Sequence, residues 1–85
     1  FTFKAARERL AGLLLELGDR FGKKSADRVQ VGLTLKREEV AEMAGITIET
    51  AIRLLSAFRN EGLLTIDGRV ITLLNLDHLA RIARH

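Results

Sequence analysis

Two side chains of opposite charge, Glu49 and Arg53, stand four residues apart in a stretch with helical apolar spacing. That separation places both on one face of a helix. The planar guanidinium of an arginine can pair with guanine O6 and N7 in the major groove of DNA, and a glutamate can accept from a cytosine amino group. The same spacing suits an ordinary surface ion pair, worth about 0.3–0.5 kcal/mol. Spacing alone leaves both interpretations open.

Catalytic chemistry finds little support in the sequence. The two histidines, His78 and His85, match no metal-binding or triad spacing, and no glycine-rich phosphate loop is present. Glu38, Glu39 and Glu42 fit the solvated face of a helix. We therefore expect that this chain is not an enzyme and that its residues bind no metal or cofactor.

The charged pair belongs to a pattern of two helices joined by a very short turn. Residues 37–44 predict the first helix, and Gly45 can end it in the left-handed conformation. Thr47 can then cap a second helix over residues 48–60. The apolar stripe of the first helix comprises Val40, Ala41, Met43 and Ala44. This pattern predicts a helix-turn-helix whose second helix enters DNA.

Apolar spacing divides the second helix into two faces. Ala51, Leu54, Leu55 and Phe58 are expected to face the core. The residues expected elsewhere on its surface are Ile48, Glu49, Ile52, Arg53 and Ser56.

Residues 3–21 carry apolar side chains at positions 3, 6, 10, 13, 14 and 17, which predicts an amphipathic helix ending near residues 18–22. It would either pack on the domain core or form part of a dimer seam. Residues 23–27 are polar and are expected to form a connector. The alternation over residues 29–35 predicts a short strand.

A β-hairpin and a last helix complete the predicted elements. Asp67 and Gly68 are a strong hairpin turn signal, flanked by apolar residues at 63, 64 and 66 and at 70, 71 and 73. Residues 75–84 predict a final helix. We expect one α+β domain over residues 1–85, a mainly helical winged helix-turn-helix with a small antiparallel β-wing of two or three strands.

Composition permits nucleic-acid binding without requiring it. The net charge is +3 and the pI is about 10.0, which favours a polyanionic partner weakly. Cysteine is absent, and neither a leader peptide nor a long apolar run is present. The expected setting is cytoplasmic, with no membrane partner. Because the chain starts with Phe1 rather than Met, we expect a piece of a longer protein.

Several polar side chains near the helix pair and the hairpin could contact phosphates. Such contacts fix the register of a protein on DNA without reading sequence. The candidates are Lys36, Arg37, Thr47, Thr50, Ser56 and Arg69.

The stretch AGITIETAIRLLSAFRNEGLLTIDGRVITLLNLDHLARIA, residues 44–83, resembles the C-terminal DNA-binding domain of the Crp/Fnr superfamily of bacterial transcription regulators, the Fnr/FixK branch above all. AARERLAGLLLELGDRFG, residues 5–22, is similar to the helix that follows the dimerisation helix of the family. Nearly the whole chain is covered. The E-T-x-x-R-x-L run and the downstream D-G-R hairpin carry the resemblance.

The resemblance implies base contacts by Glu49 and Arg53, which match the Glu and Arg that read the TGA core of each half-site. Thr50 matches a phosphate-contacting threonine, Arg37 a basic residue at the start of the first helix of the pair, and Arg69 a cation of the wing. Two further positions on the second helix depart from relatives: Ile48 replaces an arginine of the cyclic-AMP receptor branch, and Ile52 replaces a serine of Fnr. We expect both isoleucines to touch bases, with Ile52 suited to a thymine methyl group.

The resemblance further implies a homodimer on double-stranded DNA, RNA polymerase as a partner, and a separate N-terminal domain that senses an effector. It implies activation or repression of transcription. The alternative from another class is a winged-helix protein-interaction or dimerisation module that does not bind DNA. Such a module would bind its partner independently of salt concentration and would have no special need for Arg53.

Overall fold

The computed structural model of the chain describes residues 2–32 and 34–84, which form four helices and four strands. The predicted α+β class is confirmed. The helices are α1 (Phe3–Phe21), α2 (Arg37–Ala44), α3 (Ile48–Asn60) and α4 (Leu76–Ala83). The strands are β1 (Gly22–Ser25), β2 (Arg28–Val31), β3 (Leu64–Asp67) and β4 (Val70–Leu73).

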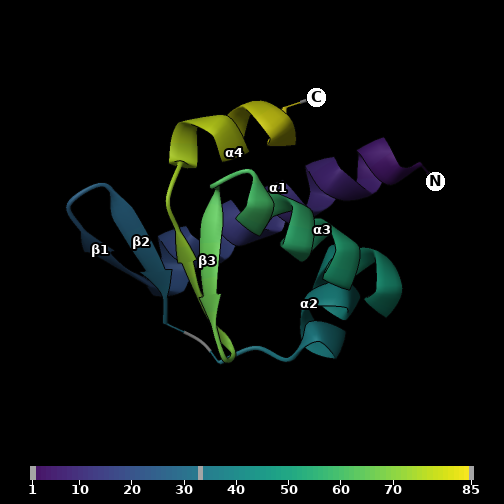
Figure 1. The fold of residues 1–85 in the computed structure, drawn as a ribbon, viewed down its shortest axis with the longest axis horizontal. Coiled ribbons are helices and arrows are strands. Elements are labelled where there is room, and N and C mark those ends of the chain that lie inside the picture. The colour runs from purple at the N-terminus through teal and green to yellow at the C-terminus, as the bar shows by residue number, and fades with distance from the viewer. Residues whose placement is uncertain (1, 33, 85) are drawn as a thin grey trace.

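The strands form one antiparallel sheet in the order β1-β2-β4-β3. Strand β2 joins the C-terminal hairpin through the pairs Val29 with Leu73 and Gln30 with Thr72. Figure 1 shows α2 and α3 on one side of the β3–β4 hairpin and the β1–β2 hairpin on the other. The helix-turn-helix pair and the β3–β4 wing therefore lie side by side in one domain.

Two predictions about the sheet were wrong. The polar connector over residues 23–27 forms β1 and a turn at Ala26, whose φ of 58° lies in the left-handed region. The sheet therefore has four strands rather than two or three. The strand predicted over residues 29–35 ends at Val31; Leu35 is buried outside any strand, and Leu33 lies outside the described residues.

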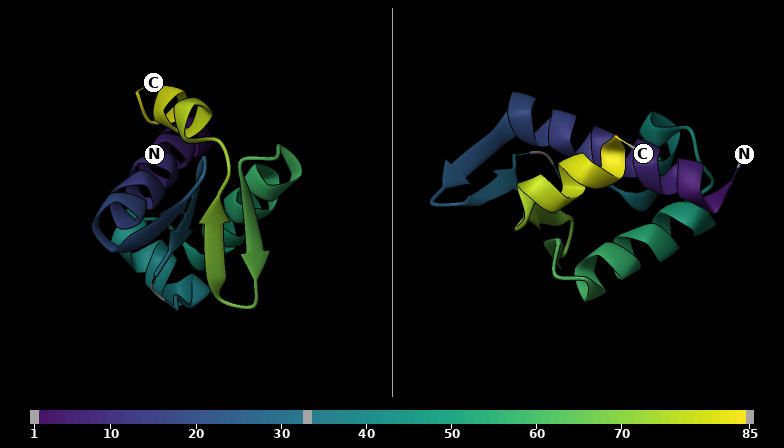
Figure 2. Two further views of the ribbon diagram at one scale, coloured as in Figure 1. Left: turned by 90° about the vertical axis from the view of Figure 1, so that its left-hand side faces the viewer. Right: turned by 90° about the horizontal axis from the view of Figure 1, so that it is seen from above.

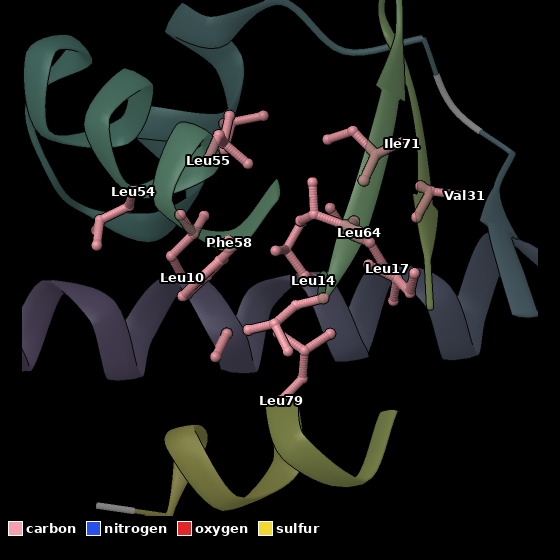
Figure 3. Close-up of a cluster of buried hydrophobic side chains, with 14 of the residues drawn as sticks. Leu10, Leu14, Leu17, Val31, Leu54, Leu55, Phe58, Leu64, Ile71 and Leu79 are labelled. Carbon is pink, nitrogen blue, oxygen red and sulfur yellow. The ribbon is translucent and has the colours of Figure 1, made fainter. Parts of the chain in front are cut away.

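The apolar stripe of α1 belongs to the core of the domain. Leu10, Leu14 and Leu17 meet side chains from α3, the β3–β4 hairpin and α4 (Figure 3). The core-helix alternative accounts for this stripe, although Phe3 at its start is exposed. Met43, expected in the apolar stripe of α2, is also exposed, whereas Val40, Ala41 and Ala44 are buried.

Candidate nucleic-acid interface

The turn between α2 and α3 has the predicted glycine at its start and the predicted threonine cap at its end. Gly45 takes a φ of 71°, and its N–H and that of Ile46 donate to the last carbonyls of α2. Thr47 caps α3 by accepting a hydrogen bond from the Thr50 N–H at 3.2 Å. Ala41 and Ala51 are both buried, which lets the two helices approach closely. The predicted bounds of both helices are confirmed.

The N-terminal half of α3 presents four predicted base-contacting side chains to solvent. Ala51, Leu54, Leu55 and Phe58 bury the opposite side of the helix. The exposed side chains are Ile48, Glu49, Ile52 and Arg53. This surface, which we call the α3 face, is fixed in direction by the buried side behind it.

Glu49 and Arg53 do not neutralise each other. Within residues 2–32 and 34–84, neither side chain takes part in an ion pair or a side-chain hydrogen bond. The surface ion pair left open by their spacing is therefore absent from the unbound domain. Both charged groups are available to an external partner.

Two hydroxyl groups stand at the N-terminus of α3. The Oγ1 atoms of Thr47 and Thr50 are 2.9 Å apart, with Thr47 exposed and Thr50 half-buried. The first amides of a helix carry partial positive charge, which favours an anion beside them. Both predicted phosphate contacts lie next to the α3 face.

The wing tip meets the entrance to α2. The Leu35 N–H donates to the Arg69 carbonyl at 3.4 Å, and Gly68 forms the turn with a φ of 64°. Lys36 follows directly, is exposed, and donates its backbone N–H to the Glu39 carboxylate at 2.9 Å. Figures 1 and 2 show the hairpin tip beside this loop. The fold thus gathers exposed cations from two distant segments of the chain.

Ser56, another predicted phosphate contact, lies away from the two threonines at the N-terminus of α3. It is half-buried, lies six residues beyond Thr50, or about 9 Å along the helix axis, and accepts a hydrogen bond from Arg59 Nη2 at 3.4 Å. Arg59, an exposed cation, was not among the predicted site residues. Arg59 lies three residues after Ser56, and this spacing alone places the two side chains on one face of the helix.

No catalytic cluster is found among the described residues. His78 is half-buried and its backbone N–H donates to the Asn75 side chain, while His85 lies outside the described residues. In residues 2–32 and 34–84 no group of three or more potential ligands comes together to hold a metal. None of the described helices is long and apolar enough to cross a membrane.

A family model described as the Crp-like helix-turn-helix domain matches residues 8–82. The chain belongs to this family. The Crp-like domain is 38% identical over 82 residues to the fumarate and nitrate reduction regulatory proteins of Escherichia coli K12 and of Salmonella typhimurium LT2. The match covers 96% of this chain and 33% of each relative.

Solved structures agree with the assignment. The CO-dependent transcription factor CooA from Carboxydothermus hydrogenoformans matches with a TM-score of 0.86 and 34% identity over 95% of this chain and 38% of its own. A CRP-family transcriptional regulator from Thermus thermophilus matches with a TM-score of 0.81 and 31% identity over 94% of this chain and 40% of its own.

Family membership defines the class of function. Crp/Fnr regulators bind DNA and act as dimers, and a Crp-like domain serves sequence-specific DNA binding in transcription regulation, not catalysis. The chain spans about a third of the length of the relatives it matches.

Proposed function

We propose that the N-terminal half of α3 enters the major groove and reads a TGA-containing half-site, with two copies of the domain on one inverted repeat. The observation that carries this proposal is the α3 face, where Glu49 and Arg53 are exposed and unengaged by described residues. The TGA core comes from the family resemblance. Arg53 would pair with guanine O6 and N7, and Glu49 would accept from a cytosine amino group.

Phosphate contacts would flank the α3 face and set its register. Thr47 and Thr50 stand at the helix N-terminus, and Lys36, Arg37 and Arg69 lie where the wing tip meets α2. Backbone contacts position a protein on DNA without reading sequence. The same role is proposed for Ser56, further along the helix.

Assembly as a homodimer would place the two α3 helices about one helical turn of DNA apart. One copy alone should bind weakly, because it loses the second half-site and the linkage between the two. In the full protein, a dimerisation helix and an effector domain would supply this linkage and its control. The regulator would work in the cytoplasm and act on RNA polymerase.

Fluorescence anisotropy tests the proposal. The domain is measured alone and in a paired form, in which a coiled coil added before residue 1 joins two copies. Each form is titrated with a TTGA…TCAA inverted repeat and with a scrambled duplex, at two salt concentrations. We expect the paired form to prefer the repeat and its affinity to fall steeply with salt. Failure of the paired form to bind either duplex would instead favour the protein-interaction module.

A further inference from the structure

Two aliphatic side chains on the α3 face are open to solvent. Ile48 and Ile52 are 45% and 48% exposed, and they lie one helical turn apart. Single exposed apolar residues are common, but among the large apolar side chains that the described residues expose, these two are adjacent. An apolar surface on the α3 face would be buried best against an apolar group of the partner.

The isoleucines and the charged pair form neighbouring stripes. Successive helical residues are turned by about 100°, so Ile48 and Ile52 run along α3 beside Glu49 and Arg53. All four side chains are exposed. A partner held by Arg53 must therefore present a surface to Ile52 as well.

The surroundings of the stripe favour DNA over a protein as this partner. Next to the isoleucines lie an unengaged Arg53 and the Thr47 and Thr50 hydroxyls, and the domain has a net charge of +3. Duplex DNA offers one apolar group in its major groove, the C5-methyl of thymine, which side chains recognise by apolar contact. Cytosine carries hydrogen there unless it is methylated.

We propose that Ile52, with Ile48 beside it, selects a C5-methylated pyrimidine next to the base pair that Arg53 contacts. The inference rests on the proposed function, because it requires α3 to lie in the major groove. It adds an apolar contact with a methyl group to the hydrogen bonds proposed for Arg53 and Glu49. Thymine is the ordinary ligand, and 5-methylcytosine presents the same group.

Replacement of single methyl groups in the DNA tests this inference. The paired form first selects its own preferred site from a random-sequence pool, and each thymine of that half-site is then replaced singly by deoxyuridine. Loss of one buried methyl group should weaken binding about fourfold at one position. In Ile52→Ala, thymine and uracil at that position should bind equally.

A matched control separates this contact from a general loss of apolar surface. Met43 on α2 is 47% exposed, close to the 48% of Ile52, but lies outside the α3 face. Met43→Ala should keep the full difference between thymine and uracil. Because Ile52 and Met43 are both exposed, both variants should fold. A second comparison, cytosine against 5-methylcytosine at the same position, should show tighter binding of the methylated base by the wild type and by Met43→Ala, but not by Ile52→Ala.

The outcomes distinguish failure of the inference from failure of the proposed function. A selected site at which uracil replaces every thymine without loss would overturn the methyl contact and leave sequence-specific binding intact. Persistence of the methyl effect in Ile52→Ala, or its loss in Ile48→Ala alone, would overturn the assignment to Ile52. Failure to select any site would reject the proposed function, and the inference with it.

Discussion

Arg7, near the start of α1, and Glu61, at the end of α3, form a bidentate ion pair. Arg7 Nη2 lies 2.6 Å from Glu61 Oε1, and Arg7 Nη1 lies 2.9 Å from Oε2. The guanidinium carbon also stands 5.0 Å from the centre of the buried Phe58 ring. The C-terminal end of α3 is thereby tied to α1, whereas the charges on the α3 face remain unengaged by described residues.

Arg7→Ala should lower the free energy of unfolding by about 1 kcal/mol, because it removes the ion pair and the contact with Phe58. The loss is modest because the Arg7 and Glu61 side chains are 25% and 37% exposed. Urea unfolding gives the measurement. Arg20→Ala is the control: its pair with Glu16 spans 3.3 Å at 67% and 56% exposure and should contribute little. Equal losses in the two variants would contradict this account.

The ion pair should also make stability depend on pH in the acid range. The hydrogen bond from Arg7 lowers the pKa of Glu61 below its ordinary value of 4.5. A carboxyl with a lowered pKa in the folded state adds stability above its unfolded pKa, and this stability is lost as pH falls through the folded value. The difference in unfolding free energy between wild type and Glu61→Gln should therefore be constant near neutrality and shrink below about pH 4.5. A difference that grows on acidification would contradict the sign.

Two glycine substitutions should have opposite effects on stability. Gly45 has a φ of 71°, and a Cβ added there would stand 2.8 Å from Arg9 Nη1, so Gly45→Ala should cost about 1 kcal/mol or more. Gly12 lies inside α1 with only an ordinary contact of 4.0 Å to Ala83. Gly12→Ala should therefore be neutral or stabilise by up to about 1 kcal/mol. Thermal unfolding of both variants compares them, and a stable Gly45→Ala would refute the role given to the turn.

Arg53 should carry discrimination between bases. Arg53→Ala should cost about 1–3 kcal/mol on the cognate repeat and relax the preference at that base pair. Arg53→Lys keeps the charge but loses the planar fork, so it should retain affinity for scrambled duplex while losing preference. Competition anisotropy with single-base variants of the repeat checks both. Losses of Arg53→Ala that are equal on cognate and scrambled duplex would remove Arg53 from base recognition.

Arg69 should act on all duplexes alike. Because it stands at the wing tip beside the loop that enters α2, Arg69→Ala should weaken cognate and scrambled binding to a similar extent. It should also reduce the slope of log affinity against log salt by about 1. Arg81→Ala makes the same charge change on α4, away from the wing tip (Figure 1). A salt slope that falls as much in Arg81→Ala would show that net charge alone is at work.

The helix-turn-helix could be predicted from the sequence because its signals are local. A glycine able to take a positive φ, followed by a threonine cap, fixes both helix boundaries within three residues. The outward direction of Ile48 and Arg53 follows from the apolar spacing of α3, so the composition of the α3 face was predictable too. These features depend on neighbours in the chain rather than on the rest of the fold.

The remainder depends on contacts between distant segments. Strand β1 contains Lys23 and Lys24 and no apolar alternation, and it exists because it pairs with β2; its turn uses Ala26 at positive φ, where glycine or asparagine would have been the signal. The loop before α2 meets Arg69 through a hydrogen bond between segments far apart in the sequence. Whether Glu49 and Arg53 pair with each other is a matter of side-chain conformation, which spacing does not determine.

The most direct test of base recognition by α3 is a double-substitution cycle between Arg53 and the guanine of the half-site. Replacing that guanine by 7-deazaguanine removes only the N7 acceptor, one of the two groups that a guanidinium fork would contact. The paired wild type should lose about fivefold in affinity, as expected for one hydrogen bond of about 1 kcal/mol, and Arg53→Ala should lose nothing further. Equal losses in the two proteins, or no loss in the wild type, would contradict the claim that Arg53 reads this base.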